Sequence, residues 1–437
     1  MSKKSLVLVV VFVSVALVIS VGFALRMRVV SHQIPSLPPP PKGVVYELPV
    51  VDDSLPIDAY EKRAEQEPGA LAFNALAQAY YRLGKRNGKQ ENFEKAKILV
   101  ARSLAEQSSE NKAARALSIR LLQAEHEFER SLEKIAEFEK DFPSAEVAST
   151  LKITALVALG RSGEALAIAN AIVAALPTSG AFVLAGSVAE EAGDARRAVA
   201  LLSTAIEDEE PGEAAALTFP RAVLGRLYLR RGQLEDARVC LESALKIDAE
   251  DVMSLRLLAH LEALEGNYRA AEQALVKAIG VYSDADIFVQ LSRVKRLLGD
   301  PRQAADMLRT AESTFREDLA KSHYGHRLQM AQMLLERKTQ ESAKEAATVA
   351  RDDLASRGHP FVKIVLARAL VESGAASMAR EVLDPVLASS FENPSLFLVA
   401  GKIARAEKND SEANRFFERA TAMNSNYREN CEYCPLF

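Results

Sequence analysis

A short pattern of small and apolar residues recurs three times between Phe219 and Ala311. Gly232, Gly266 and Gly299 each end an apolar run, and they lie 34 and then 33 residues apart. Alanine, leucine and alanine follow each glycine at +5, +9 and +12, as Ala237, Leu241, Ala244, Ala271, Leu275, Ala278, Ala304, Leu308 and Ala311. A period in this range is typical of stacked units of two helices. The sequence therefore predicts an architecture, and with it a class of function.

Each unit reads as a pair of antiparallel helices. Leu224, Leu227 and Tyr228 have the spacing of one apolar helical face. Gly232 then ends this helix, because glycine takes the left-handed conformation without steric cost. A second helix is predicted from Leu234 to Ile247, with Leu241 in the core. One such hairpin cannot bury both of its faces, so neighbouring hairpins must stack.

These registered residues resemble the tetratricopeptide repeat family. The matching residues are Leu224, Gly225, Tyr228, Gly232, Ala237, Leu241 and Ala244 in one unit, and Leu258, Ala259, Gly266, Ala271, Leu275 and Ala278 in the next. The resemblance implies an all-α fold, a right-handed α-solenoid of about ten helix hairpins over residues 57–427. It also implies that the first helix of each hairpin lines a concave surface, and that the protein binds partner proteins or peptides.

Weaker versions of the unit extend the solenoid in both directions. They are marked by Leu122, Ile135, Phe138 and Pro143; Leu156, Gly160, Ala165, Ala169 and Pro177; Gly186, Gly193, Ala198, Leu202 and Ala205; Ala331, Leu334, Ala343, Ala347 and Ala350; Ala367, Gly374, Ala379 and Leu383; and Gly401, Ala413, Phe417 and Ala420. Another hairpin begins with Leu76, Ala77, Tyr80 and Gly84, and we interpret the polar stretch from Lys85 to Glu91 as a loop inserted into it. One continuous superhelix is expected.

The N-terminal segment differs in kind. Leu6 to Ala24 is a run of 19 residues without a charge, preceded by Lys3 and Lys4. This length favours a transmembrane helix that anchors the protein through residues 1–28. A cleaved signal peptide ending near Ala24 is the alternative. Because a short N-terminus with two lysines tends to stay in the cytoplasm, we predict a single-pass inner-membrane protein with a periplasmic solenoid.

Residues 29–56 are predicted to form a linker. Five of its prolines favour an extended, semi-rigid polyproline conformation, and they are Pro35, Pro38, Pro39, Pro40 and Pro41. We interpret the segment as a stalk that lifts the solenoid off the membrane. A ligand for a proline-binding domain is the alternative.

The sequence does not predict an enzyme. The six histidines are scattered, with neither an HExxH motif nor a paired metal-ligand spacing among them, and the sequence has no phosphate-binding glycine loop. His323 and His326 are close enough in the sequence to share a metal, but a polar helix face is the plainer interpretation. A net charge of -4, with 6% aromatic residues and no tryptophan, does not suggest a nucleic-acid partner. No cofactor is predicted.

The three cysteines fall into two groups. Cys240 is expected to be a buried free thiol inside a repeat helix. Cys431 and Cys434 form a CxxC in the tail, residues 428–437. A local disulfide is one interpretation of the pair, half of an intermolecular zinc site is another, and thiol exchange is a third.

The predicted function is that of a membrane-anchored scaffold in cell-envelope assembly. One alternative is a chaperone or maturation factor for an exported protein, with a thiol-active CxxC at Cys431 and Cys434. Another is a cytoplasm-facing regulator similar to the lipopolysaccharide assembly protein B family, which shares the anchor, the repeats and C-terminal cysteines. That family needs two CxxC pairs, and this chain has one.

A basic column is the predicted binding surface. At one equivalent position in the first helices of six successive hairpins, the residues are Arg226, His260, Arg293, Gln332, Arg368 and Lys402. The neighbouring helical turn adds Arg230, Arg296 and Arg405. Arginine binds carboxylates through two parallel hydrogen bonds, so an acidic segment of a partner protein is the expected ligand. The asparagine that chaperone-binding members of the family carry in this column is missing, so their carboxylate-clamp mode is not predicted.

Overall fold

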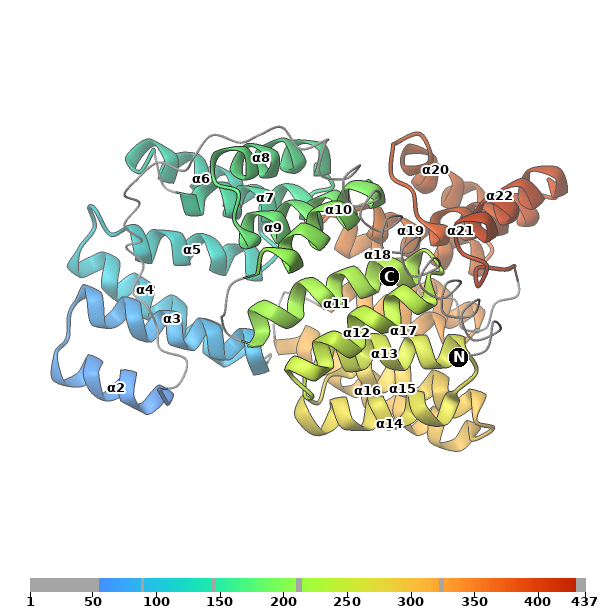
Figure 1. The fold of residues 1–437 in the computed structure, drawn as a ribbon, viewed down its shortest axis with the longest axis horizontal. Coiled ribbons are helices and arrows are strands. Elements are labelled where there is room, and N and C mark those ends of the chain that lie inside the picture. The colour runs from blue at the N-terminus through green and yellow to red at the C-terminus, as the bar shows by residue number, and fades with distance from the viewer. Residues whose placement is uncertain (1–54, 88–89, 144–145, 210–213, 322–325, 430–437) are drawn as a thin grey trace, which may run out of the picture.

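The computed structural model describes residues 55–87, 90–143, 146–209, 214–321 and 326–429 (Figure 1). These residues form 21 helices and no strand. The segment that we interpret as a membrane anchor, nearly all of the proline-rich linker, and Cys431 and Cys434 lie outside the described residues. Among the helices that the structure describes, none is long and apolar enough to cross a membrane.

Helix α2 (Ile57–Gln66) comes first, and the other described helices form ten consecutive pairs. The pairs are α3 (Ala70–Asn87) with α4 (Gln90–Glu106), α5 (Lys112–Ala124) with α6 (Phe128–Asp141), α7 (Glu146–Ala158) with α8 (Ser162–Ala175), α9 (Ser179–Glu191) with α10 (Ala195–Glu207), α11 (Ala214–Arg230) with α12 (Leu234–Ile247), α13 (Val252–Leu264) with α14 (Tyr268–Val281), α15 (Ala285–Leu297) with α16 (Pro301–Lys321), α17 (Arg327–Leu335) with α18 (Gln340–Leu354), α19 (Pro360–Glu372) with α20 (Ala376–Leu387), and α21 (Pro394–Ala406) with α22 (Asp410–Met423).

The hairpin of α11 and α12 forms as the sequence predicts. Gly232 has a φ of 69°, and the amide of Gln233 donates a hydrogen bond of 3.0 Å to the carbonyl of Tyr228, which closes the end of α11. Helix α12 then runs from Leu234 to Ile247, the predicted bounds. Leu241 is fully buried, and it packs where Gly225 leaves room on α11, because a Cβ at Gly225 would lie 2.8 Å from Leu241 Cδ2.

The interpretation of Lys85 to Glu91 as a loop insertion is wrong. Helix α3 continues through Lys85 to Asn87, and α4 begins at Gln90. Gly84 therefore does not end its helix. Its physical role is close packing, since an added Cβ would lie 3.0 Å from the ring of Phe93 on α4. The hairpin is simply longer than its neighbours.

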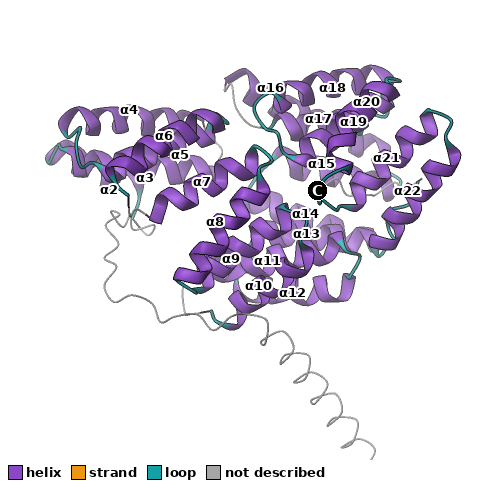
Figure 2. Cartoon of the chain, turned by 90° about the horizontal axis from the view of Figure 1, so that it is seen from above, coloured by secondary structure: helices purple, strands orange, loops and turns teal. Residues whose placement is uncertain are grey.

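The hairpins stack in chain order into two layers. Each second helix packs against the first helix of the next pair, and first helices also contact first helices, as in α9 with α11 and α17 with α19. The first helices form the inner layer of a curved array, and Figure 2 shows that the described chain is helical nearly throughout. A nearest-neighbour arrangement of this kind is characteristic of solenoids.

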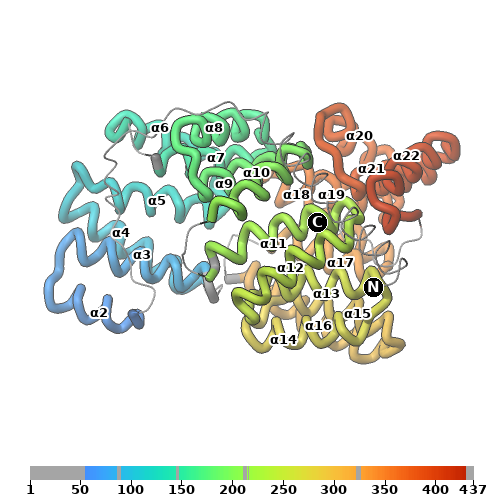
Figure 3. The backbone as a smooth tube through the Cα atoms, in the orientation of Figure 1, coloured from blue at the N-terminus to red at the C-terminus, as the bar shows by residue number. Residues whose placement is uncertain are grey.

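The superhelix also contacts itself, which nearest-neighbour stacking does not require. Figure 3 shows the C-terminal hairpins lying beside α9 to α11. Asn424 Nδ2 donates to the carbonyls of Leu229 and Arg230 at 2.9 and 3.1 Å, although these residues are 195 and 194 positions away in the sequence. We call this contact between successive turns the seam.

Glycine turns of the first superhelical turn make the seam. A Cβ at Gly160 would lie 2.5 Å from the carbonyl oxygen of Gly358, and one at Gly193 would lie 3.1 Å from the Cα of Phe391. Both glycines have positive φ, at 76° and 84°. Gly266 has the same backbone conformation, with a φ of 82°, but open space around it. Gly160 and Gly193 thus have two roles. Each ends a helix with a positive φ, and each lets the backbones of two superhelical turns approach closely.

We predict that Gly160→Ala destabilises the protein more than Gly266→Ala. Both changes place a Cβ in the left-handed region, which costs about 1–2 kcal/mol. Gly160→Ala also forces apart the two superhelical turns, which adds about 1–3 kcal/mol of overpacking. Urea unfolding of both variants measures the difference. Equal free energies of unfolding for the two would contradict the seam.

Candidate functional site

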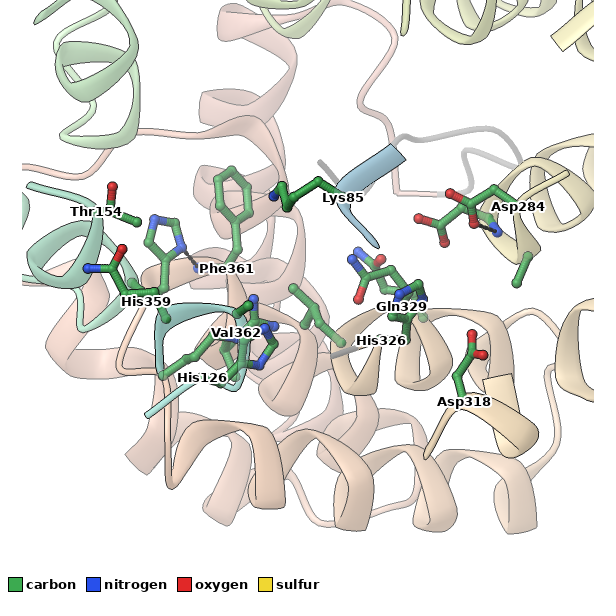
Figure 4. Close-up of a pocket in the computed structure, with 18 of the residues that line it drawn as sticks. Lys85, His126, Thr154, Asp284, Asp318, His326, Gln329, His359, Phe361 and Val362 are labelled. Carbon is green, nitrogen blue, oxygen red and sulfur yellow. Dashed lines mark hydrogen bonds between the residues drawn. The ribbon is translucent and has the colours of Figure 1, made fainter. Parts of the chain in front are cut away.

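A cavity of about 1570 Å³ lies inside the superhelix. Its walls come mainly from first helices, with residues such as Arg120 on α5, Thr154 on α7, Arg226 on α11 and Gln332 on α17. This follows from the curvature of the array, because the inner layer of a curved solenoid faces its axis. Figure 4 shows side chains from distant parts of the chain converging on this cavity, among them Lys85, Thr154, Asp284 and His326. We call it the central cavity.

The seam closes one side of the central cavity. His359 Nε2 lies 3.1 Å from Glu191 Oε2, and His359 Nδ1 accepts a hydrogen bond of 3.2 Å from the amide of Phe361. Burial alone would raise the pKa of the Glu191 carboxyl, but the close contact with His359 and the charge of Arg230 lower it to about 2. This part of the wall is therefore ordered and charged.

The predicted arginines Arg226 and Arg230 line the central cavity together. Both bind one carboxylate, that of Glu190 on the neighbouring hairpin, at 2.7 and 2.8 Å. The Glu190 side chain is only 2% exposed, whereas that of Arg226 is 26% exposed. Arg230 also lies over the ring of Phe361, 5.0 Å from its centre, across the seam. A buried carboxylate thus holds two guanidinium groups at the cavity wall.

Arg293 and Arg296 repeat this arrangement. They bind the two oxygens of Glu336 at 3.0 and 2.9 Å. Burial would raise the pKa of the Glu336 carboxyl, but Arg293, Arg368 and Arg296 lower it below its usual value. Arg293 lines the central cavity, as does Gln332 from the same predicted column.

The other predicted residues do not line the central cavity. Arg368 and Lys402 share the carboxylate of Glu372, at 2.7 and 3.7 Å, and Arg405 binds Glu429 and Asp410. Burial lowers the pKa of the Lys402 ammonium, and the charge of Arg368 lowers it further. The sequence column is therefore split, with its N-terminal part at the central cavity and its C-terminal part elsewhere.

His260 also belongs to the predicted column, but it is buried, with 4% of its surface exposed. Burial lowers its pKa to about 3, and the charge of Arg293 acts in the same direction. The imidazole is therefore neutral at physiological pH. Its position in α13 is a core position and not a surface of the groove.

One wall of the central cavity is acidic. Asp284, Asp286 and Asp318 line it near Tyr282. Burial raises the pKa of the Asp286 carboxyl, while Arg256, whose guanidinium lies 3.6 Å away, opposes the shift. The side-chain amide of Gln290 accepts from the same arginine at 2.9 Å when its oxygen faces the guanidinium. The cavity thus has walls of different charge.

Four residues of the site are missing from the predicted column. Glu190 and Glu336, which bind its arginines, belong to neighbouring hairpins, and the sequence alone does not show which carboxylate of another hairpin an arginine contacts. Arg120 and Lys85 line the central cavity from the first hairpins. Both lie on first helices, and this position is the sequence signal that could have identified them.

The described residues contain no cluster of three or more side chains suited to a metal ion. His326 is described, whereas His323 lies outside the described residues. Cys240 is a free thiol, half-buried and not fully buried as expected. Burial raises the pKa of this thiol to about 11, so the thiolate that would act as a nucleophile is scarce at neutral pH.

The comparisons with known proteins identify the repeat. Residues 189–261 match the family model described as tetratricopeptide repeat. The matched segment runs from the end of α9 to α13 and contains Arg226, Arg230 and His260. No curated protein matches the sequence.

Three solved structures resemble the fold at low identity. A tetratricopeptide repeat protein from Parabacteroides merdae is 18% identical with a TM-score of 0.34, covering 56% of this chain and 93% of its own. The human IFIT1 dimer with PPP-AAAA is 14% identical with a TM-score of 0.44, covering 85% and 94%. PilW, a widely conserved type IV pilus biogenesis factor, is 15% identical with a TM-score of 0.40, covering 49% and 98%.

We predict that His260→Gln flattens the dependence of stability on pH. The folded protein keeps His260 neutral down to about pH 3, whereas the unfolded chain protonates it near pH 6.5. Stability is therefore complete above pH 6.5 and falls with acidification between these values, by up to about 1.4 kcal/mol per pH unit.

Urea unfolding of wild type and His260→Gln across this range tests the prediction. The carboxylates titrate in both proteins, so the difference between the two curves isolates the histidine. The free energies of unfolding should converge as the pH falls from 6.5 towards 3. A constant separation would contradict the burial of a neutral imidazole.

Proposed function

We propose that this chain, a tetratricopeptide repeat protein, is an interaction scaffold that binds a segment of a partner protein in its central cavity. The observation that carries the proposal is the cavity itself. At about 1570 Å³ it exceeds the roughly 300–1,000 Å³ of ordinary small-molecule pockets. An extended stretch of polypeptide is an occupant of suitable size.

The polar groups of the cavity wall support a polypeptide ligand. Arg226 uses Nε and one terminal nitrogen for Glu190, and Arg293 binds Glu336 through Nη2. A guanidinium has five N–H donors, so donors of Arg226 remain for a ligand. Gln329 and Gln332 add amide groups to the same cavity. Backbone amides and carbonyls of an extended segment are the natural complement of such a surface.

The finer proposal is that the partner segment is acidic. Arg226, Arg230 and Arg293 contribute oriented guanidinium groups from the predicted column, whereas Arg296, Arg368, Lys402 and Arg405 of the same prediction lie outside the central cavity. Rigidly held arginines bind carboxylates through paired hydrogen bonds. Because Glu190 and Glu336 already offset much of their charge, the dependence of affinity on salt should be moderate.

The proposed setting is the bacterial cell envelope. The uncharged run from Leu6 to Ala24, with Lys3 and Lys4 before it, supports a single inner-membrane anchor. The prolines of residues 29–56 support a stalk between the anchor and the repeats. In this arrangement the solenoid is periplasmic, where it meets envelope proteins during assembly.

We predict that the double variant Arg226→Gln and Arg293→Gln lowers capture of partner proteins from detergent-solubilised membranes by about tenfold or more. Both variants remove donors at the cavity wall. The fold should survive, because Arg230 still binds Glu190 and Arg296 still binds Glu336.

Quantitative mass spectrometry of the captured proteins measures the loss. Arg368→Gln, which removes an arginine outside the central cavity, is the matched control and should retain capture. If the folded double variant captured the same proteins in the same amounts, the cavity arginines would not form the binding surface.

We predict that a reporter fused after Phe437 and active only after export is active. The prediction follows from the two lysines, Lys3 and Lys4, that directly precede the uncharged run from Leu6 to Ala24. A reporter of the cytoplasm at the same position should be inactive. The opposite pattern would place the solenoid in the cytoplasm and favour the resemblance to the lipopolysaccharide assembly protein B family.

A further inference from the structure

The cations of the central cavity fall into two groups. Most of them have a carboxylate partner within the protein. These are Arg226 and Arg230 with Glu190, Arg256 with Asp286, Arg293 with Glu336, and Arg357 with Asp353. Their positive charge is already offset before any ligand arrives.

Arg120 and Lys85 form the second group. Both line the central cavity, and within the described part of the chain neither has a hydrogen-bond, ion-pair or ring partner. Arg120 lies on α5 and is half-buried, and Lys85 lies near the end of α3. Figure 4 shows the Lys85 side chain reaching into the cavity toward Phe361. Among the described residues, the arginine and lysine side chains of the cavity that lack a carboxylate partner are therefore these two, and the exposed Glu91 of α4 also lines the cavity.

The surroundings make Arg120 an unusual group. Tyr81, Phe93 and Gln123 line the same wall, and the rings of Tyr81 and Phe93 pack edge to face with their centres 5.8 Å apart. Burial raises the pKa of the Tyr81 hydroxyl, and the positive charge of Arg120 opposes the shift. A guanidinium that is partly withdrawn from water beside aromatic rings gains strongly from an anionic partner.

Buried acceptors point to the rest of the ligand. Gln329 Oε1 and Ser187 Oγ line the central cavity, and neither has a hydrogen-bond partner among the described residues. Both can accept a hydrogen bond from a peptide N–H. A simple inorganic anion has no donor to offer these atoms, whereas an extended peptide has one at almost every residue.

The acidic wall gives the ligand a direction. Asp284, Asp286 and Asp318 line the cavity from the start of α15 and from α16, whereas Lys85 and Arg120 belong to α3 and α5. Like charges repel, so an acidic side chain is disfavoured against these residues and favoured against Arg120 and Lys85. The two walls together discriminate between the two orientations of a bound chain.

We propose that the partner segment bound in the central cavity places an aspartate or glutamate side chain against Arg120, with Lys85 as a second cation. This inference rests on the proposed function. It assigns recognition of the acidic side chain of the ligand to Arg120 and Lys85, which are not part of the predicted column. The paired arginines then orient the backbone of the segment, and Arg120 selects its side chain.

Selection of random peptides displayed on phage tests the proposal on the purified full-length chain. Peptides selected by wild type should share an aspartate or glutamate at one position. Selection on Arg120→Gln should still yield peptides, but without that shared acidic residue. Arg302→Gln is the matched control. It removes the same charge from an exposed residue of α16 that lies outside the central cavity.

Affinities of one selected peptide complete the test through a double-mutant cycle. Changing its shared glutamate to glutamine should weaken binding to wild type about tenfold, and Arg120→Gln should have the same effect on the original peptide. Both changes together should weaken binding no further. Lys85→Gln should have a smaller effect, because Lys85 is exposed.

The outcomes separate this inference from the proposed function. Peptides selected without any acidic preference, or an acidic preference that Arg120→Gln leaves intact, would overturn the role of Arg120 while the cavity remained a peptide site. Failure of wild type to select any peptide would overturn the proposed function, and this inference with it. Thermal unfolding of Arg120→Gln matching that of wild type excludes a loss of folding as the cause.

Discussion

In three of the described hairpins, the distance between the two helices depends on one contact between a glycine and a large side chain. A Cβ on the first helix would collide with the second helix in three hairpins, where the pairs are Gly186 with Leu202, Gly225 with Leu241, and Gly401 with Phe417. The close approach buries Leu202 and Leu241 completely. Since every hairpin stacks on the next, this local spacing sets the curvature, and the curvature creates both the central cavity and the seam.

Local features of the fold could be predicted from the sequence because they depend on neighbours in the chain. The bounds of α12 and the left-handed Gly232 follow from residues within one repeat. The same reasoning failed at Gly84, because glycine serves both to end a helix and to admit a ring such as that of Phe93. The residue type alone does not distinguish these two roles.

The central cavity could be predicted only in part, because its character depends on contacts between hairpins. The sequence indicated Arg226 and Arg293, but not that Glu190 and Glu336 offset their charge. His260 occupies the equivalent position in α13 and is buried. Predicting a binding surface from equivalent positions of successive hairpins assumes that each of these positions faces the cavity. The seam breaks that equivalence, because it brings some first helices to the cavity and leaves others away from it.

The seam also restricts how this chain can evolve. An open solenoid tolerates the gain or loss of a repeat, because each hairpin contacts only its neighbours. Here Gly160 meets Gly358, Gly193 meets Phe391, and Leu229 meets Asn424 at nearly the same separation along the chain. Inserting or deleting one hairpin between them would shift all three contacts out of register at once. The number of repeats in one superhelical turn is therefore a fixed property of this architecture, and variation in length is expected outside the closed segment.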